Sequence, residues 1–149
     1  MRALLVAILL ALVGPRSVVT ATNWPDKPYV EVRAYAYNRD GDPDRAIVNN
    51  GQLDHSVINK HGVLLAREQT GRLVAAITGD RPEPHFSTAC FNPRHAFVFY
   101  DAAKKPVATV ELCFECHNAE ARPFHKGQVY NVDALEKLAR DLNLPLVPK

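Results

Sequence analysis

Residues 96–114 read Ala-Phe-Val-Phe-Tyr, then Asp-Ala-Ala-Lys-Lys-Pro, then Val-Ala-Thr-Val-Glu-Leu-Cys-Phe. The outer two runs are rich in aromatic and β-branched residues, which favour strands, and the middle run is typical of a turn. The stretch therefore predicts a β-hairpin with strands over 96–100 and 107–114. If Tyr100 pairs with Val107, His95 lies opposite Leu112.

One more strand and two helices are expected around this hairpin. Residues 29–37 alternate apolar and polar side chains, which is the pattern of a strand with one face in the core. A helical apolar stripe over 64–78 predicts a helix that ends at Gly79, and Asn131 is a candidate N-cap for a second helix. That second helix would carry Leu135, Leu138 and Leu142 on one face. Turns are expected at 38–44 and 49–51, and an irregular link over 117–130.

Strands and helices do not alternate strictly along the chain. This order favours an α+β fold over a doubly wound sheet. We therefore predict a small single domain with an antiparallel sheet, which includes the hairpin over about 95–114, and two amphipathic helices.

The first residues have the pattern of a secretory signal peptide. Arg2 precedes an apolar run over 3–13, and Val19-Thr20-Ala21 fits a small-residue cleavage site. This run is too short for a transmembrane helix, which needs about 20 apolar residues. We expect a leader over 1–21 and one exported domain over 22–149, periplasmic or extracellular, with no membrane span in the mature chain.

The charge of the chain argues against nucleic acid as a partner. The sequence has 18 basic and 16 acidic side chains, and Arg2 and Arg16 would leave with the leader. The mature chain would then be balanced, and its sequence shows no basic stripe with interleaved aromatic residues. Other partners stay unknown.

Three cysteines are expected at the open end of the hairpin. Cys113 and Cys116 form a Cys-x-x-Cys pair, and the register would place Cys90 opposite His117. Cys90, His95, Cys113 and Cys116 would supply the four ligands of a tetrahedral zinc site, with His117 as the second candidate for the fourth ligand. The first hypothesis is thus a metal-binding module, with zinc as the expected metal.

Three other interpretations of the cysteines stay open. A stapling disulfide, most simply from Cys90 to one member of the pair, would suit an exported protein. The string Cys-Phe-Glu-Cys-His over 113–117 is the attachment motif of haem c, with Cys113, Cys116 and His117 binding the haem of an electron carrier. An exchanging Cys113–Cys116 pair would instead make a thiol–disulfide redox protein.

A familiar pattern runs through the same region. Cys90-Phe-Asn-Pro-Arg-His95, then Phe99-Tyr100-Asp101, then Cys113-Phe-Glu-Cys116 resembles a group of uncharacterised bacterial exported and lipoprotein-like proteins. The resemblance spans roughly residues 46–145, and its specific part is confined to 90–116. It implies a family defined by three cysteines and a Pro-Arg-His run, and it brings no established activity.

Catalytic motifs are otherwise missing from the sequence. It shows no Ser-His-Asp order, Gly-rich phosphate loop or paired-carboxylate spacing. Catalytic residues therefore stay unknown, and the chain is expected to be a metal-binding or disulfide-stapled module, with the haem carrier and the redox protein as alternatives.

Overall fold

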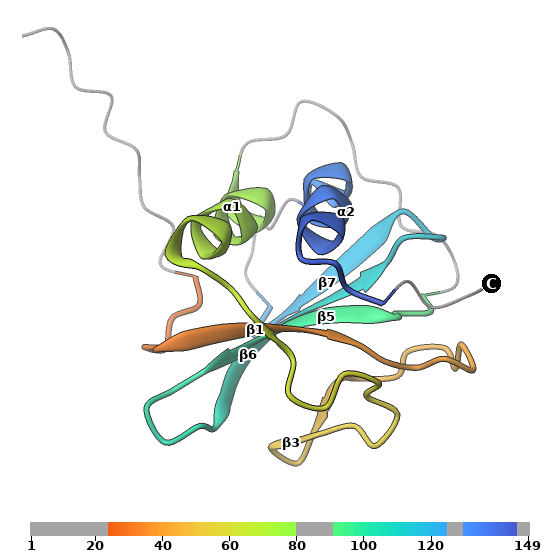
Figure 1. Cartoon of the computed structure of the whole chain (residues 1–149), viewed down its shortest axis with the longest axis horizontal. Coiled ribbons are helices and arrows are strands. Elements are labelled where there is room, and N and C mark those ends of the chain that lie inside the picture. The colour runs from red at the N-terminus through yellow and green to blue at the C-terminus, as the bar shows by residue number, and fades with distance from the viewer. Residues whose placement is uncertain (1–23, 80–90, 125–129, 146–149) are drawn as a thin grey trace, which may run out of the picture.

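The computed structural model describes residues 24–79, 91–124 and 130–145. One antiparallel sheet has the strand order β4-β1-β5-β6-β7. Two helices cover one face of this sheet, and a small β2–β3 hairpin lies on the other side (Figure 1). The prediction of a small α+β domain is confirmed. The elements are β1 (Glu31–Ala36), β2 (Val48–Asn49), β3 (Gln52–Leu53), β4 (Val63–Leu64), α1 (Arg67–Thr78), β5 (His95–Tyr100), β6 (Pro106–Cys113), β7 (Asn118–Arg122) and α2 (Val132–Asp141).

The β5–β6 hairpin is the centre of the sheet. Every side chain of β5 is buried, and His95 pairs with Leu112 as the sequence predicts. A register shift at the end of β5 pairs Tyr100 with Pro106 in place of Val107. The turn is held by Asp101, whose Oδ1 accepts backbone N–H groups two and four residues further along, at 2.9 Å each. Local hydrogen bonds of this kind favour Asp in turns.

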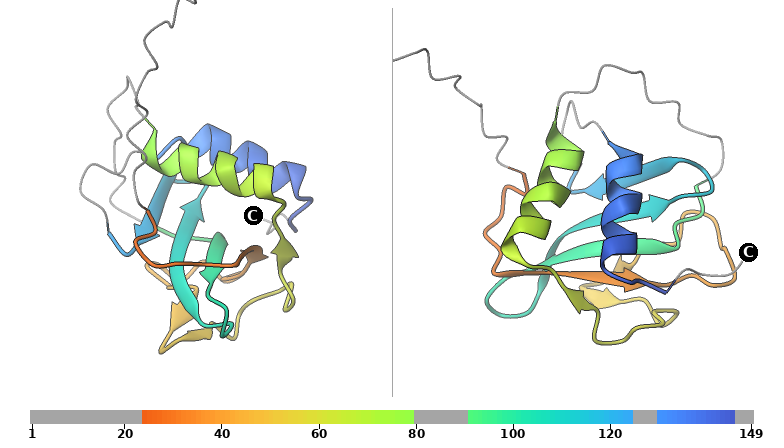
Figure 2. Two further views of the ribbon diagram at one scale, coloured as in Figure 1. Left: turned by 90° about the vertical axis from the view of Figure 1, so that its left-hand side faces the viewer. Right: turned by 45° about the horizontal axis from the view of Figure 1, so that its top comes forward.

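The main core lies between the sheet and the two helices, which run side by side above it (Figure 2). Phe97 and Phe99 of β5 share this core with Leu73 of α1 and Leu138 of α2. Asn131 caps α2 as predicted, because its side chain accepts the N–H of Ala134 at 3.1 Å. Burying each large apolar side chain contributes about 1.5–3 kcal/mol, so this layer is the main source of stability.

The second face of the sheet is also buried. Ile47 and Val57, from the segment between β1 and β4, pack with Tyr35 of β1 and with Tyr37 just after this strand. The Tyr37 hydroxyl donates to Arg45 O at 2.9 Å, so this buried phenol has a hydrogen-bond partner. The sheet is therefore covered on both faces, although the alternating pattern of residues 29–37 predicts only one buried face.

Three element predictions need correction. The strand expected over 29–37 begins only at Glu31, and Val30 before it is 64% exposed. The first helix begins at Arg67 and not at residue 64, since Val63–Leu64 forms β4 and pairs with β1. Residues 118–122, expected in an irregular link, form β7. Its sequence Asn-Ala-Glu-Ala-Arg has little strand propensity, so pairing with β6 decides its conformation.

Within the described ranges, neither helix is long and apolar enough to cross a membrane. The predicted leader over 1–21 lies outside these ranges, as does Cys90.

Candidate functional site

The Cys-x-x-Cys pair lies at the tight turn that joins β6 to β7. Cys113 ends β6 and pairs with Asn118, which leaves the four residues 114–117 as the connection. The His117 N–H donates to Phe114 O at 3.1 Å, and His117 itself has a φ of 48°. Four-residue hairpin loops are commonly built around such a turn. His117 therefore adopts a left-handed backbone conformation in the turn. The Cys-x-x-Cys-His motif alone does not indicate this role.

A disulfide joins Cys113 to Cys116 across this turn. Their Cα atoms are 5.2 Å apart, within the usual range for a disulfide. The backbone N–H of Cys116 also donates to Cys113 Sγ at 3.1 Å. Cys113 is fully buried, whereas Cys116 is half-buried. The bridge thus links neighbours in sequence, unlike the simplest staple expected from the sequence, which ran from Cys90 to one of the pair.

Arg94 lies beside the turn and joins it to the loop that follows β1. Its Nη1 donates to Arg39 O at 2.9 Å, and its Nη2 is 3.9 Å from Glu115 Oε2. Gly41 makes room for this guanidinium, since a Cβ there would lie 2.9 Å from Arg94 Nη2. A positive charge is therefore held next to the cysteine turn.

His95 lies on the helix-covered side of the sheet. Its ring is buried beside Phe114, with 5.0 Å between centroids, and its Nε2 is 3.0 Å from Pro145 O. Burial lowers the pKa of His95, and the contact with the Pro145 carbonyl only partly opposes this. The ring is therefore neutral at pH 7, with Nε2 donating to Pro145. Its Nδ1 finds no hydrogen-bond partner among the described residues.

The cysteine pair and His95 do not face the same way. Leu112, the cross-strand partner of His95, belongs to the helix-side core, and side chains alternate along a strand. Cys113 therefore points to the opposite face, with Glu111. No group of three or more His, Cys, Asp or Glu side chains in the described ranges is arranged to hold a metal ion. Because Cys90 lies outside those ranges, the full zinc ligand set stays a prediction.

The haem ligand set is contiguous in the turn. The His117 side chain is 56% exposed, and its Nε2 is 3.9 Å from Asp133 Oδ1 at the start of α2. With the sulfurs of Cys113 and Cys116 joined to each other, neither is a thiol that could form a thioether. Haem attachment would require the two cysteines as free thiols, so the haem interpretation stays a prediction for the chain with this disulfide reduced.

Glu111 is a buried carboxyl group that the sequence reasoning missed. It is 2% exposed, and its Oε1 accepts the Ile47 N–H at 2.9 Å. Burial raises the pKa of this carboxyl, while the hydrogen bond from Ile47 lowers it less. Glu111 lies two residues before Cys113, on the same face of β6. The segment around Ile47 covers Glu111, and no local pattern in the sequence signals this burial.

Comparisons with protein-family models, with curated proteins and with solved structures gave no match. The resemblance to exported bacterial proteins accordingly stays a prediction.

Proposed function

We propose that this chain is an exported, disulfide-stapled module whose Cys113–Cys116 bridge undergoes thiol–disulfide exchange. The observation that carries the proposal is the bridge itself, which closes a four-residue turn at the end of a hairpin. Export would bring the pair into an oxidising setting in which such bridges persist.

Energetics favour a reversible bridge over a purely structural one. Closing so short a loop stabilises the fold by about 2 kcal/mol in the chain-entropy treatment, against roughly 4.7 kcal/mol for a loop of about 100 residues. The antiparallel pairing of β6 with β7 already brings the two ends of the turn together. The fold therefore depends little on this bridge, and opening the bridge leaves the sheet intact.

The environment of the two sulfurs suggests a direction for the exchange. A small thiolate of the glutathione class attacks Cys116 Sγ, which belongs to the less buried residue. The disulfide bond breaks, a mixed disulfide forms at Cys116, and Cys113 leaves as a thiolate. The Cys116 N–H at 3.1 Å stabilises that leaving thiolate, and a better leaving thiolate speeds exchange. A second small thiolate then attacks the small-molecule sulfur of the mixed disulfide, which breaks its bond to Cys116 Sγ and releases Cys116 as a thiolate. Both protein thiolates take up protons from solvent, so the protein gains two thiols and the two small thiols become one disulfide.

A zinc site in the reduced protein is the second candidate. The same N–H···Sγ bond favours it, because zinc binds the thiolate form of cysteine. Such a site would use Cys113, Cys116 and Cys90, with His117 or His95 as the fourth ligand. His117 shares the turn with the pair, whereas His95 lies on the other face of the sheet.

The test is a thiol count and an elemental analysis of the protein, purified without reductant from an exporting host with haem-attachment machinery. The exchange proposal expects one alkylatable thiol per denatured chain and no stoichiometric metal. Incubation with reduced glutathione should raise the count by two while the circular dichroism spectrum stays native. Cys116→Ser is the matched variant, and it should show no glutathione-dependent increase.

Different results identify the other candidates. Three thiols with one zinc per chain would favour the zinc site over the exchange proposal. Stoichiometric iron with a haem absorption band would overturn both and favour a haem carrier.

A further inference from the structure

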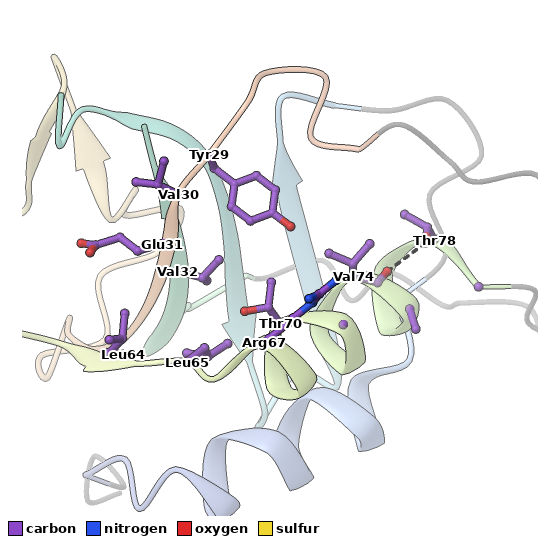
Figure 3. A pocket seen from close by; sticks show the side chains of 13 residues that line it. Tyr29, Val30, Glu31, Val32, Leu64, Leu65, Arg67, Thr70, Val74 and Thr78 are labelled. Atoms are coloured by element: carbon purple, nitrogen blue, oxygen red, sulfur yellow. Dashed lines mark hydrogen bonds between the residues drawn. The ribbon is translucent and has the colours of Figure 1, made fainter. Parts of the chain in front are cut away.

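An apolar groove of about 860 Å³ lies between the start of β1 and one side of α1 (Figure 3). Tyr29, Val32, Leu65 and Val74 are among its lining residues. Its volume falls within the range of roughly 300–1,000 Å³ that is typical of small-molecule sites. Val30 and Leu64 also line it and are 64% and 54% exposed, so the groove presents apolar surface to solvent.

One face of helix α1 packs into the main core, and another face lines this groove. Leu73 and Ile77 are fully buried in the main core. The groove side has the three- and four-residue spacing of a continuous helical stripe. That stripe consists of Arg67, Thr70, Gly71, Val74, Ala75 and Thr78.

Gly71 keeps the groove open at the middle of α1. Glycine destabilises a helix interior relative to alanine. A Cβ built at Gly71 meets no atom within 4 Å, so packing within the described chain does not require glycine there. The missing side chain instead leaves space in the groove.

Arg67 supplies a cation at one end of the same stripe. It is the first residue of α1, where the helix dipole disfavours positive charge. Arg33 and Arg72 pair with Glu31 and Asp141 at 2.9 and 2.8 Å, whereas Arg67 has no such partner among the described residues. An anion bound beside Arg67 would offset this unfavourable placement.

The polar groups along the groove favour an acyl chain over a peptide. The Glu31 carboxylate also lines the groove, and it is paired with Arg33 and Lys104. The Val30 N–H donates to Tyr100 O at 2.8 Å, and Val32 O accepts the Leu65 N–H at 3.0 Å. The Thr78 hydroxyl donates to Val74 O at 2.9 Å. A buried peptide would need new partners for each of its N–H and C=O groups, whereas an acyl chain needs none.

We propose that this groove binds a fatty-acid-like carboxylate, with the acyl chain along α1 and the carboxylate at Arg67. The site is separate from the cysteine turn and does not depend on the exchange proposal.

Isothermal titration calorimetry of the exported protein with dodecanoate, below the micelle concentration, tests the proposal. We expect saturable binding of one dodecanoate per chain. Arg67→Gln should weaken it by about tenfold or more, because a charge-assisted contact is lost. Arg72→Gln, on the same helix but outside the groove, should leave the affinity unchanged.

A second variant, which fills the groove, distinguishes loss of binding from loss of the fold. Gly71→Leu should abolish dodecanoate binding and leave the melting temperature equal or higher, since leucine favours helix more than glycine does. Absence of saturable binding to the wild type would overturn the proposal, and so would unchanged binding in both Arg67→Gln and Gly71→Leu. A second copy of the chain as the occupant would appear as a wild-type dimer that Gly71→Leu dissociates, which would also overturn it.

Discussion

Glu111 places a carboxyl group on the covered second face of the sheet, where its Oε1 accepts the Ile47 N–H at 2.9 Å. Burial raises the pKa of this group. The native state therefore binds the proton more tightly than the unfolded chain does. The resulting stabilisation is complete below the unfolded pKa and is lost as the pH rises through the folded pKa.

Glu111→Gln should remove this pH dependence. The amide oxygen still accepts the Ile47 N–H, and the side chain does not ionise. We expect the variant to gain stability relative to the wild type as the pH rises from about 4 to about 8, with a slope of at most about 1.4 kcal/mol per pH unit. Urea unfolding at a series of pH values measures the difference. A difference that is constant with pH would contradict this account of Glu111.

The contribution of His95 to the pH dependence of stability has the opposite sign. Burial lowers the pKa of the ring, so the unfolded chain takes up the proton first as the pH falls. The stability that depends on neutral His95 is present above the unfolded pKa and is lost as the pH falls through the folded pKa.

His95→Phe retains an aromatic ring beside Phe114 and does not titrate. We expect its stability relative to the wild type to rise as the pH falls from about 8 to about 5, again by urea unfolding. A difference between His95→Phe and the wild type that does not change with pH would contradict the role of burial.

At the scale of elements, the Cys113–Cys116 disulfide closes a short loop within the turn that joins β6 to β7. Reduction of its disulfide should lower the free energy of unfolding by about 2 kcal/mol. Urea unfolding with and without reductant measures this change, and Cys90→Ser should show the same change. A loss above roughly 4 kcal/mol would mean that the cysteines cross-link distant segments, contrary to the bridge described here.

Two glycines lie where an added Cβ would contact no other atom, so alanine substitutions there test the effect of backbone conformation without an effect of packing. A Cβ at Gly71 or at Gly51 meets nothing within 4 Å, but Gly51 has a φ of +75° in the β2–β3 turn. Gly71→Ala should stabilise the fold by about 1 kcal/mol, and Gly51→Ala should destabilise it by about 1 kcal/mol. Thermal unfolding of both variants tests this, and a shift of the same sign in both would contradict it.

The elements that the sequence predicted well have strong local signals. The aromatic and β-branched runs over 96–114 indicate the central hairpin, and Asn131 marks the start of α2 by its capping side chain. The missed strand β7 has no such signal, because Asn118–Arg122 extends only through its pairing with β6. The two-residue strand β4 is likewise held by β1 and not by its own sequence.

At the scale of the whole molecule, the second covered face is what the sequence could not reveal. Tyr35 and Tyr37 alternate with apolar residues over 29–37, so this strand predicts one polar face. The segment around Ile47 and Val57 buries that face, and no local pattern announces this packing. The opposite orientation of His95 and Cys113 has a different origin. The predicted register already pairs His95 with Leu112, so alternation along β6 puts Cys113 on the other face, a consequence that the predicted zinc ligand set did not take into account.

The central claim is that the Cys113–Cys116 bridge opens and closes in a folded protein. Disulfide mapping by mass spectrometry, after rapid alkylation of the native protein in glutathione buffers of graded potential, tests it most directly. We expect the Cys113–Cys116 link in oxidising buffer, two alkylated thiols in reducing buffer, and a native circular dichroism spectrum in both. A bridge that resists reduction until the chain unfolds would contradict the claim. So would cysteines that are held throughout by metal, by haem or by a bond to Cys90.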